Sequence, residues 1–413
     1  MGPMHDNSGC SRLVFRATAL PATHPGSTCS LTQLLPASGG AAWLGARRQM
    51  VGLGRALTLE SASADAIAQV RAAWETVAAP APGEGPAPVL FASFAFRSPA
   101  RSVAFVPSLT VIDEAGARWA ITAGIGRAPD PLEAVDAAMG EARRSPRVPD
   151  SLSCGHGSMS RGQWRDSVRQ MAARLREGAA DKAVMARDMT IISDSPFDQA
   201  ALVEHLHQRY PQTWTFAVAG LIGATPEMLV SLHQGKLHSR VLAGSSKPED
   251  ADSLPLSLKD RSEHLFAVES VVAALLSVAQ DVQAPARPDV LILPNIAHLS
   301  SDVYATFPQG SVLDAVAQLH PTAAVCGTPT DDALDLIHTY ERAERERYSG
   351  PVGWIDGAGN GEFGIALRCG QLENNDRTLR IFAGCGIMPD STSRSELEET
   401  QTKMRPLLEV LNL

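Results

Sequence analysis

Apolar residues recur at steps of three and four along several stretches of the chain. This spacing places them on one face of a helix, as in an amphipathic helix packed on a core. In residues 161–177, for example, Trp164, Val168, Met171 and Leu175 follow it. The pattern predicts helices over residues 61–78, 131–143, 161–177, 198–209, 258–280 and 395–411.

Short apolar stretches bounded by turn residues predict strands between these helices. Helices and strands do not alternate regularly along the chain, which favours an α+β layered fold over a doubly wound parallel sheet. The predicted strands cover residues 51–59, 89–96, 103–113, 183–193, 214–221, 227–232, 236–243, 289–293, 352–356, 363–371 and 378–383.

One segment, residues 144–160, is rich in Pro, Ser and Gly and is predicted to be an internal linker. We therefore expect an N-terminal part of the fold over residues 13–150 and a catalytic part over residues 151–413. Residues 1–12 carry no periodic pattern and are predicted to be a flexible tail.

The composition excludes several classes of partner. Of the 413 residues, 44% are hydrophobic, which is enough for a sizeable core, and the net charge is −9 without a basic tract. Neither nucleic acid nor an anionic membrane is therefore expected as a partner. The longest apolar stretch, near residues 214–224, is too short to span a bilayer, and we expect a cytoplasmic protein. The six cysteines lack metal-site spacing and are expected to be reduced thiols.

The last predicted helix carries three charged residues at steps of three and four. Glu396, Glu399 and Lys403 share one face, and Ser393 or Ser395 could cap the helix at its N-terminus. Two interpretations remain open from the spacing alone. The face could be a solvated surface with an ordinary ion pair, or its carboxylates could hold Mg²⁺ beside an anionic substrate.

Other residues suggest a site for an anion. Arg368 lies in an apolar strand, where a buried guanidinium requires an anionic partner. Gly384 and Gly386 would let backbone N–H groups approach a carboxylate, although a simple tight turn would also explain them. Lys182 enters another apolar strand, and Glu263 lies in a charged cluster at a helix start; each is also compatible with an ordinary surface residue.

Ten stretches of the chain resemble, in the same order, the chorismate-utilising enzymes. This family includes isochorismate, salicylate, anthranilate and aminodeoxychorismate synthases. The resemblance is dense over residues 160–411, weak before them, and implies a single large layered domain with antiparallel sheets flanked by helices. The matching stretches are KAVMAR (182–187), LIGATPEMLV (221–230), VLAGSS (241–246), SLKDRSEHLFAVES (257–270), AHL (297–299), LHPTAAVCGTP (319–329), ERERYSGPVGWID (344–356), GEFGIALR (361–368), FAGCGIM (382–388) and ELEETQTK (396–403).

Two positions distinguish the chemistries within this family. Ammonia-using anthranilate synthases typically carry Gln where this chain has Lys182, and aminodeoxychorismate synthases carry a nucleophilic Lys where it has Ala243. Lys182 with Ala243 therefore points to water as the nucleophile. The form of residues 319–329 resembles isochorismate synthases, with a salicylate synthase that goes on to eliminate pyruvate as the alternative.

The resemblance also implies roles for individual residues. Lys182 would be the base that deprotonates water, and Glu227 the acid that protonates the leaving hydroxyl. Mg²⁺ would lie between Glu263 and Glu399, with Glu396 close. The implied substrate-binding residues are Ala243, Gly244, His298, Arg368, Gly384, Gly386 and Lys403.

The implied substrate is chorismate, and a glutaminase subunit is not expected. A monomer and a homodimer both remain open, as do menaquinone and siderophore biosynthesis as the pathway served. Two departures from the family's usual motif stand in the VLAGSS stretch, where Ser245 replaces the common Thr and Val241 the common Pro. Neither replacement removes an implied catalytic group.

Overall fold

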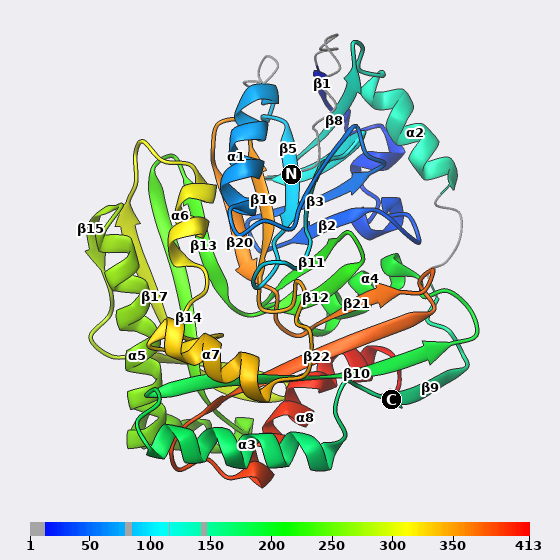
Figure 1. The fold of residues 1–413 in the computed structure, drawn as a ribbon. Helices are drawn as coiled ribbons and strands as arrows, with labels where there is room; N and C mark the ends of the chain where they lie inside the picture. Colours follow the sequence, from blue (N-terminus) through cyan, green and yellow to red (C-terminus); the bar gives the residue numbers. More distant parts are fainter. Residues whose placement is uncertain (1–12, 79–84, 115, 142–146) are drawn as a thin grey trace.

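The structure is a computed structural model that describes residues 13–78, 85–114, 116–141 and 147–413 (Figure 1). The strands of these residues form one 12-stranded and one 10-stranded sheet, in which neighbouring strands pair antiparallel. With helices packed against both sheets, this arrangement confirms the predicted α+β class with antiparallel sheets flanked by helices.

The first sheet runs from the N-terminal strands to the strands near the C-terminus. Its order is β1 (Leu13–Ala19), β8 (Ala117–Ile125), β7 (Leu109–Glu114), β3 (Arg48–Leu53), β2 (Ala41–Leu44), β11 (Trp214–Val218), β12 (Leu221–Thr225), β21 (Cys369–Glu373), β22 (Thr378–Ile387), β10 (Lys182–Ser193) and β18 (Gly327–Thr328), with β9 (Leu152–His156) also paired to β10.

The second sheet is likewise built from distant parts of the chain. Its order is β15 (Gln280–Gln283), β17 (Ile296–Thr306), β14 (Lys236–Ser246), β13 (Met228–His233), β20 (Gly361–Ile365), β19 (Pro351–Asp356), β5 (Val89–Ser93), β6 (Ser102–Val106) and β4 (Leu57–Ser61), with β16 (Asp289–Leu293) also paired to β17.

The helices pack apolar faces on these sheets. They are α1 (Ala66–Val77), α2 (Pro131–Glu141), α3 (Arg161–Arg176), α4 (Gln199–Arg209), α5 (Leu258–Leu276), α6 (Val312–Leu319), α7 (Thr330–Tyr340) and α8 (Ser393–Val410), with short 3₁₀ turns η1 (Pro25–Ser27), η2 (Leu31–Leu34) and η3 (Pro248–Leu256). Contrary to the prediction, Thr392 caps α8: its side chain accepts a hydrogen bond from the backbone N–H of Ser395.

The N-terminal third is part of both sheets. β2 pairs with β11, and β5 pairs with β19, so blue and cyan strands lie beside green and orange ones in Figure 1. The predicted linker is only partly irregular, because its residues Leu152–His156 form β9 and pair with β10. The predicted tail, residues 1–12, lies outside the described residues.

Three segments predicted as single strands each cover two strands separated by a break. Residues 51–59 span the end of β3 and the start of β4. Residues 103–113 divide into β6 and β7 around Pro107, which has no N–H to offer a ladder. Residues 363–371 divide into β20 and β21 just before Arg368, whose φ of +49° is left-handed and cannot continue a strand.

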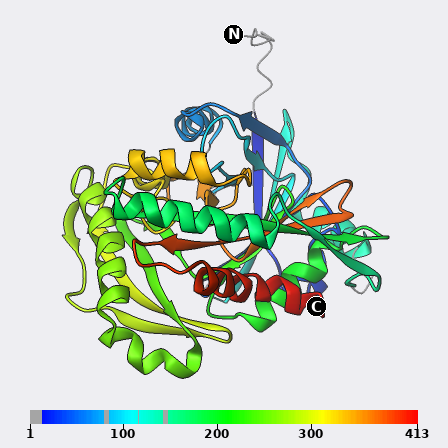
Figure 2. The ribbon, with the colours of Figure 1, turned by 60° about the horizontal axis from the view of Figure 1, so that its bottom comes forward.

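Helices from different parts of the chain enclose the region where the two sheets meet. α3, α7 and α8 gather over the part of the first sheet formed by β10 and β22 (Figure 2), while α5 packs on β14 and β17 of the second sheet. None of the described helices combines the length and the apolar character needed to cross a bilayer. All cysteines within the described ranges have free thiols.

A buried ion pair ties three segments together beside this region. Arg345 donates to both carboxylate oxygens of Glu341 at 2.6 and 2.8 Å, and to the carbonyl oxygens of Val325 and Val184 at 2.8 and 2.7 Å. Glu341 also accepts a hydrogen bond from the backbone N–H of Ala186 at 2.7 Å. Because both charges are buried and multiply bonded, the pair holds β10 against the loop that precedes β18.

We expect Arg345→Met to destabilise the fold strongly. The substitution leaves a buried carboxylate and two carbonyl groups without their donor, a loss typically worth about 3–5 kcal/mol of unfolding free energy. Urea unfolding monitored by circular dichroism measures it. Arg394→Met is the matched control: Arg394 pairs with Glu398 at the same spacing but is exposed, so the expected cost is within about 1 kcal/mol. Equal losses in the two variants would contradict the role of the buried pair.

Candidate active site

A small cavity lies where the two sheets meet, and both contribute to its walls. Its volume is about 70 Å³. β14 and β17 supply lining residues from the second sheet, β10 and β22 from the first, and α5 and α8 close it. The residues expected at the site that line this cavity are Glu227, Ala243, Gly244, Glu263, His298, Arg368, Gly384, Gly386, Glu399 and Lys403.

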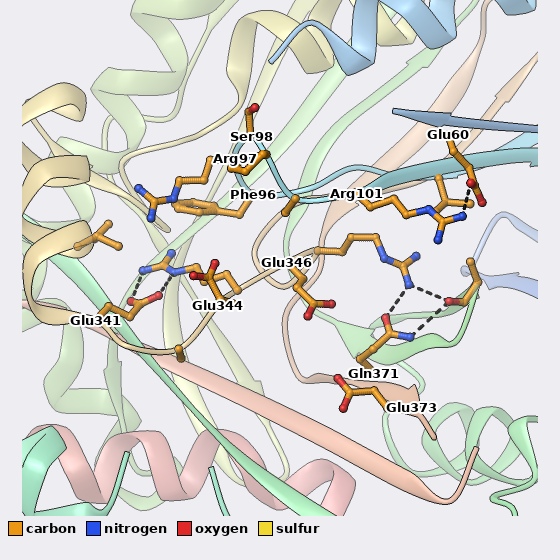
Figure 3. A pocket seen from close by; sticks show the side chains of 18 of the residues that line it. Glu60, Phe96, Arg97, Ser98, Arg101, Glu341, Glu344, Glu346, Gln371 and Glu373 are labelled. Carbon is orange, nitrogen blue, oxygen red and sulfur yellow. Dashed lines mark hydrogen bonds and ion pairs between the residues drawn. The ribbon is translucent and has the colours of Figure 1, made fainter. Parts of the chain in front are cut away.

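A much wider cavity of about 1180 Å³ lies elsewhere and contains none of the expected site residues (Figure 3). Its walls carry several arginines and several glutamates. Arg345 pairs there with Glu341, and Arg101 with Glu60. This balance of charge within the wall does not favour a dianionic ligand, and we take the small cavity as the candidate active site.

Lys182 and Glu263 form a buried ion pair at one side of the small cavity. Lys182, the first residue of β10, is 1% exposed, and its Nζ lies 2.9 Å from Oε1 of Glu263 on α5. Glu263 is a lining residue of the cavity, whereas Lys182 is not. A Cβ at Gly386 would lie 2.7 Å from that carboxylate oxygen and 2.8 Å from Cε of Lys182. A side chain at this position of β22 would therefore displace the paired groups from their present positions.

Glu227 is a buried carboxyl group in the turn between β12 and β13. Its side chain is 4% exposed, and burial raises its pKa to about 8, although Leu242 N–H and the charges of Lys182, Lys403 and Arg368 act in the opposite direction. A carboxyl group with this pKa keeps its proton at neutral pH. It can therefore donate a proton to a group inside the cavity.

Arg368 and His298 form a hydrogen-bonded chain along the cavity wall. Arg368 donates from Nη2 to Nε2 of His298 at 2.9 Å, so the imidazole must carry its hydrogen on Nδ1. That nitrogen faces Ser245 Oγ at 3.0 Å and the Gly244 carbonyl oxygen at 3.3 Å. Burial and the charge of Arg368 lower the pKa of His298 well below its usual range. His298 is therefore neutral and orients Arg368.

Arg368 retains a donor that nothing in the described part of the chain accepts. Its Nε is buried and has no hydrogen-bond partner there, although the residue is only 8% exposed. A buried, unsatisfied guanidinium donor is costly and calls for a partner. An anionic group in the cavity would supply one.

α8 contributes a second lysine–glutamate pair. Lys403 Nζ lies 2.5 Å from Glu399 Oε1 and donates to the Gly384 carbonyl oxygen at 3.0 Å. Glu396, one turn earlier, does not line the cavity; it is 4% exposed and hydrogen-bonded to the thiol of Cys385. The structure thus brings Glu399 and Lys403 into the cavity wall, whereas Glu396 is buried against Cys385 of β22.

The carboxylates fit a divalent cation of the magnesium type. Glu263 and Glu399 reach the same cavity from α5 and α8, each with hard oxygen ligands. Across the described ranges, no three His, Cys, Asp or Glu side chains are grouped as a complete metal site. Mg²⁺ does not need such a group, because it commonly takes one or two carboxylates and completes its shell with substrate oxygens and water.

Sequence reasoning did not single out two aromatic residues of the cavity. Tyr348 stacks on Phe382 with ring centroids 5.1 Å apart, and both line the cavity. A Cβ at Gly384 would lie 3.2 Å from the Tyr348 hydroxyl. Tyr348 lies in the ERERYSG stretch and Phe382 in FAGCGIM, so their motifs were recognised but their side chains were not.

Comparisons with known proteins agree on one family. The sequence profile described as "Chorismate binding enzyme" matches residues 41–412. The chain is 35% identical to isochorismate synthase DhbC of Bacillus subtilis over 60% of this chain and 68% of that protein. It is 32% identical to isochorismate synthase MenF of the same organism, over 61% of this chain and 56% of that protein, little more than half its length.

The fold also matches a solved structure. The menaquinone-specific isochorismate synthase MenF of Escherichia coli superposes with a TM-score of 0.80, covering 97% of this chain and 94% of the other. The two sequences are 20% identical, so this likeness concerns the fold.

The raised pKa of Glu227 predicts a pH-dependent stability. Unfolded Glu227 ionises near pH 4.5 and the folded residue near 8, so between these values the native state keeps a proton that the unfolded state has lost, and its stability falls as pH rises. The Glu227→Gln variant has no carboxyl group at this position, so its unfolding free energy does not fall with pH for this reason. We expect its unfolding free energy relative to wild type to rise from pH 5 to pH 8, by at most about 1.4 kcal/mol per unit.

Urea unfolding at the two pH values, without ligand or metal, measures this difference. The control is Glu398→Gln, because Glu398 is an exposed carboxylate on α8 and its substitution should have nearly the same effect at both values. A pH-independent difference for Glu227→Gln would mean that the folded carboxyl group is already ionised at pH 5.

Proposed function

The chain belongs to the family of chorismate-binding enzymes, and we propose that it is an isochorismate synthase. The reaction would isomerise chorismate by adding water at ring carbon 2 while the hydroxyl leaves carbon 4 and the double bonds shift. The observation that carries the proposal is a buried carboxyl group with a raised pKa, Glu227, in the wall of one anion-compatible cavity, whose wall also includes Glu263, the ion-pair partner of the buried Lys182.

Acid and base would act on different bonds of the substrate. Glu227 would donate its proton to the departing hydroxyl, which leaves as water. Lys182 would accept a proton from the attacking water, and for this its amine must be neutral. Its Nζ lies 2.9 Å from Oε1 of Glu263, so the proposal requires this contact to give way to the attacking water in the reacting complex. Overall, one water enters and one leaves.

The remaining residues would bind the dianionic substrate. Arg368 would hold the enolpyruvyl carboxylate together with the backbone near Gly384 and Gly386. Its Nε has no partner in the described part of the chain, and His298 orients its guanidinium. Lys403 would lie near the ring carboxylate. Ala243 and Gly244 would form the floor beside the ring, where a bulkier residue would fill the cavity.

Glu263 and Glu399 would hold Mg²⁺, which would neutralise the ring carboxylate and orient the substrate. Glu396 does not line the cavity, so it would lie near the ion without binding it directly. We also propose that the protein works without a glutaminase subunit, since Lys182 stands where ammonia-using relatives carry Gln.

Product analysis tests the proposal. Purified protein incubated with chorismate and magnesium should form isochorismate, identified by chromatography, without dependence on ammonia or glutamine. We expect Lys182→Ala and Glu227→Gln to lose at least about 100-fold in kcat, the usual contribution of a general acid or base. Lys236→Ala, on the exposed end of β14, should keep wild-type rates.

Each alternative has its own signature in this assay. Salicylate with an equal amount of pyruvate would identify a salicylate synthase, and an amino product that requires ammonia would identify an anthranilate-type enzyme. A folded Lys182→Ala variant with wild-type kcat would show that the base has been misassigned.

Metal dependence provides a separate prediction. Glu399→Ala should raise the magnesium concentration required for half-maximal rate by about tenfold or more, because it removes one of the two carboxylates proposed to hold the ion. Glu398→Ala, a neighbouring exposed residue, is the matched control. An unchanged magnesium requirement in Glu399→Ala would place the ion elsewhere.

A further inference from the structure

A further cavity, distinct from the two described above, lies on the side of α8 that faces away from the candidate active site. Its volume is about 440 Å³. Its walls come from β9, β10, the start of α3, and α8. At 100° per residue, Met404, Arg405 and Leu408 of this cavity project opposite to Glu399 and Lys403. The two cavities thus share one helix and use opposite faces of it.

Arg187 is a buried guanidinium in the wall of this cavity. The residue is 9% exposed, and its Nε donates to Thr400 Oγ1 on α8 at 2.8 Å. Its terminal nitrogens donate to no group, and it pairs with no carboxylate, in the part of the chain that the structure describes. Burial and the nearby charge of Arg161 lower its pKa to about 10, which still leaves it charged at neutral pH.

Three arginines line this cavity, Arg161, Arg187 and Arg405, against the carboxylates of Asp188 and of Leu413, the last residue of the sequence. Arg161 and Arg405 are exposed on the rim of the cavity, and neither forms an ion pair within the described ranges. The side-chain carboxylate of Asp188 already accepts hydrogen bonds from Ser158 at 2.8 and 3.0 Å and from Arg380 at 2.7 Å. By contrast, the arginines of the wide cavity in Figure 3 share its walls with several glutamates.

Much of the remaining wall is apolar, although His156 and Gln401 also line it. Met159 of the turn before α3, Met189 of β10, and Met404 and Leu408 of α8 line the same space. Methionine and leucine side chains provide an adaptable surface for a flat or irregular apolar body. A ligand that satisfied both parts of the wall would carry one anionic group and one apolar group.

We propose that this cavity binds a small carboxylic acid with an apolar ring, whose carboxylate is held by the terminal nitrogens of Arg187 between Arg161 and Arg405. A planar guanidinium matches a carboxylate with two parallel hydrogen bonds, and the buried position strengthens them. Because Arg187 is hydrogen-bonded to Thr400, the neighbour of Glu399, a bound acid would contact the helix that also serves the candidate active site. The proposal does not depend on the catalytic function.

Isothermal titration calorimetry of the full chain tests this site with three probes. Benzoate carries both groups, inorganic phosphate only the anion, and benzamide an uncharged version of benzoate. We expect saturable one-site binding of benzoate that weakens with added salt, weaker binding of phosphate, and none of benzamide. Absence of saturable benzoate binding overturns the proposal, and phosphate bound as tightly as benzoate overturns its apolar part.

Variants decide where benzoate binds. Arg187→Met should weaken benzoate binding about tenfold or more, since a hydrogen bond to a charged group is lost. Arg368→Met removes the free guanidinium donor of the candidate active site and should leave this binding unchanged. The reverse result, loss in Arg368→Met and retention in Arg187→Met, assigns benzoate to the active site and overturns the proposal.

Rim variants keep the test decisive if Arg187→Met does not fold, which circular dichroism will show. Arg161→Ala and Arg405→Ala alter exposed side chains and should fold normally. Their combination should weaken benzoate binding several-fold, while Arg165→Ala, an exposed arginine of α3 outside the cavity lining, should not. Equal affinities in the rim and control variants overturn the proposal.

Discussion

Burial of charge is the constraint on which this structure depends. Lys182, Glu227, His298 and Arg368 are all nearly removed from water at the junction of the two sheets. An ionised group in such surroundings needs a partner or changes its protonation state. Lys182 has Glu263, Glu227 keeps its proton, and His298 remains neutral while it accepts from Arg368. The chemistry available at the site follows from these three solutions to the same problem.

The same constraint explains how the walls of the site are held. Arg345 is buried, yet its donors are engaged by Glu341 and by the carbonyl oxygens of Val184 and Val325, which both line the candidate active site. A charged residue outside the small cavity thus fixes two of its backbone segments. Arg345 also lines the wide cavity, so one side chain lies in the wall of that cavity and is hydrogen-bonded to the wall of the small one.

Different faces of α8 line two different cavities. One face supplies Glu399 and Lys403 to the candidate active site, Glu396 and Thr400 lie in the interior, and the remaining face borders the cavity at Arg187. A rigid helix makes such a division possible, because residues four positions apart point nearly the same way and residues two apart point nearly oppositely. Any group that displaced α8 from one side would alter the geometry on the other.

The local sequence pattern by itself determined most of the helices and the α+β class, because a 3.6-residue apolar period is a property of short segments such as 161–176 or 258–276. It missed α6, α7 and several strands, among them β1, β2, β8 and β17. It also did not reveal that β2 pairs with β11 or β5 with β19, since pairing joins residues more than 150 positions apart. The motifs likewise named Lys182, Glu227 and Arg368. Only the tertiary structure decided that Lys182 pairs with Glu263, that Glu396 is hydrogen-bonded to Cys385 without lining the cavity, and that burial raises the pKa of Glu227. Burial, pairing and electrostatic environment depend on which distant segments come together, and no local spacing of residues encodes them.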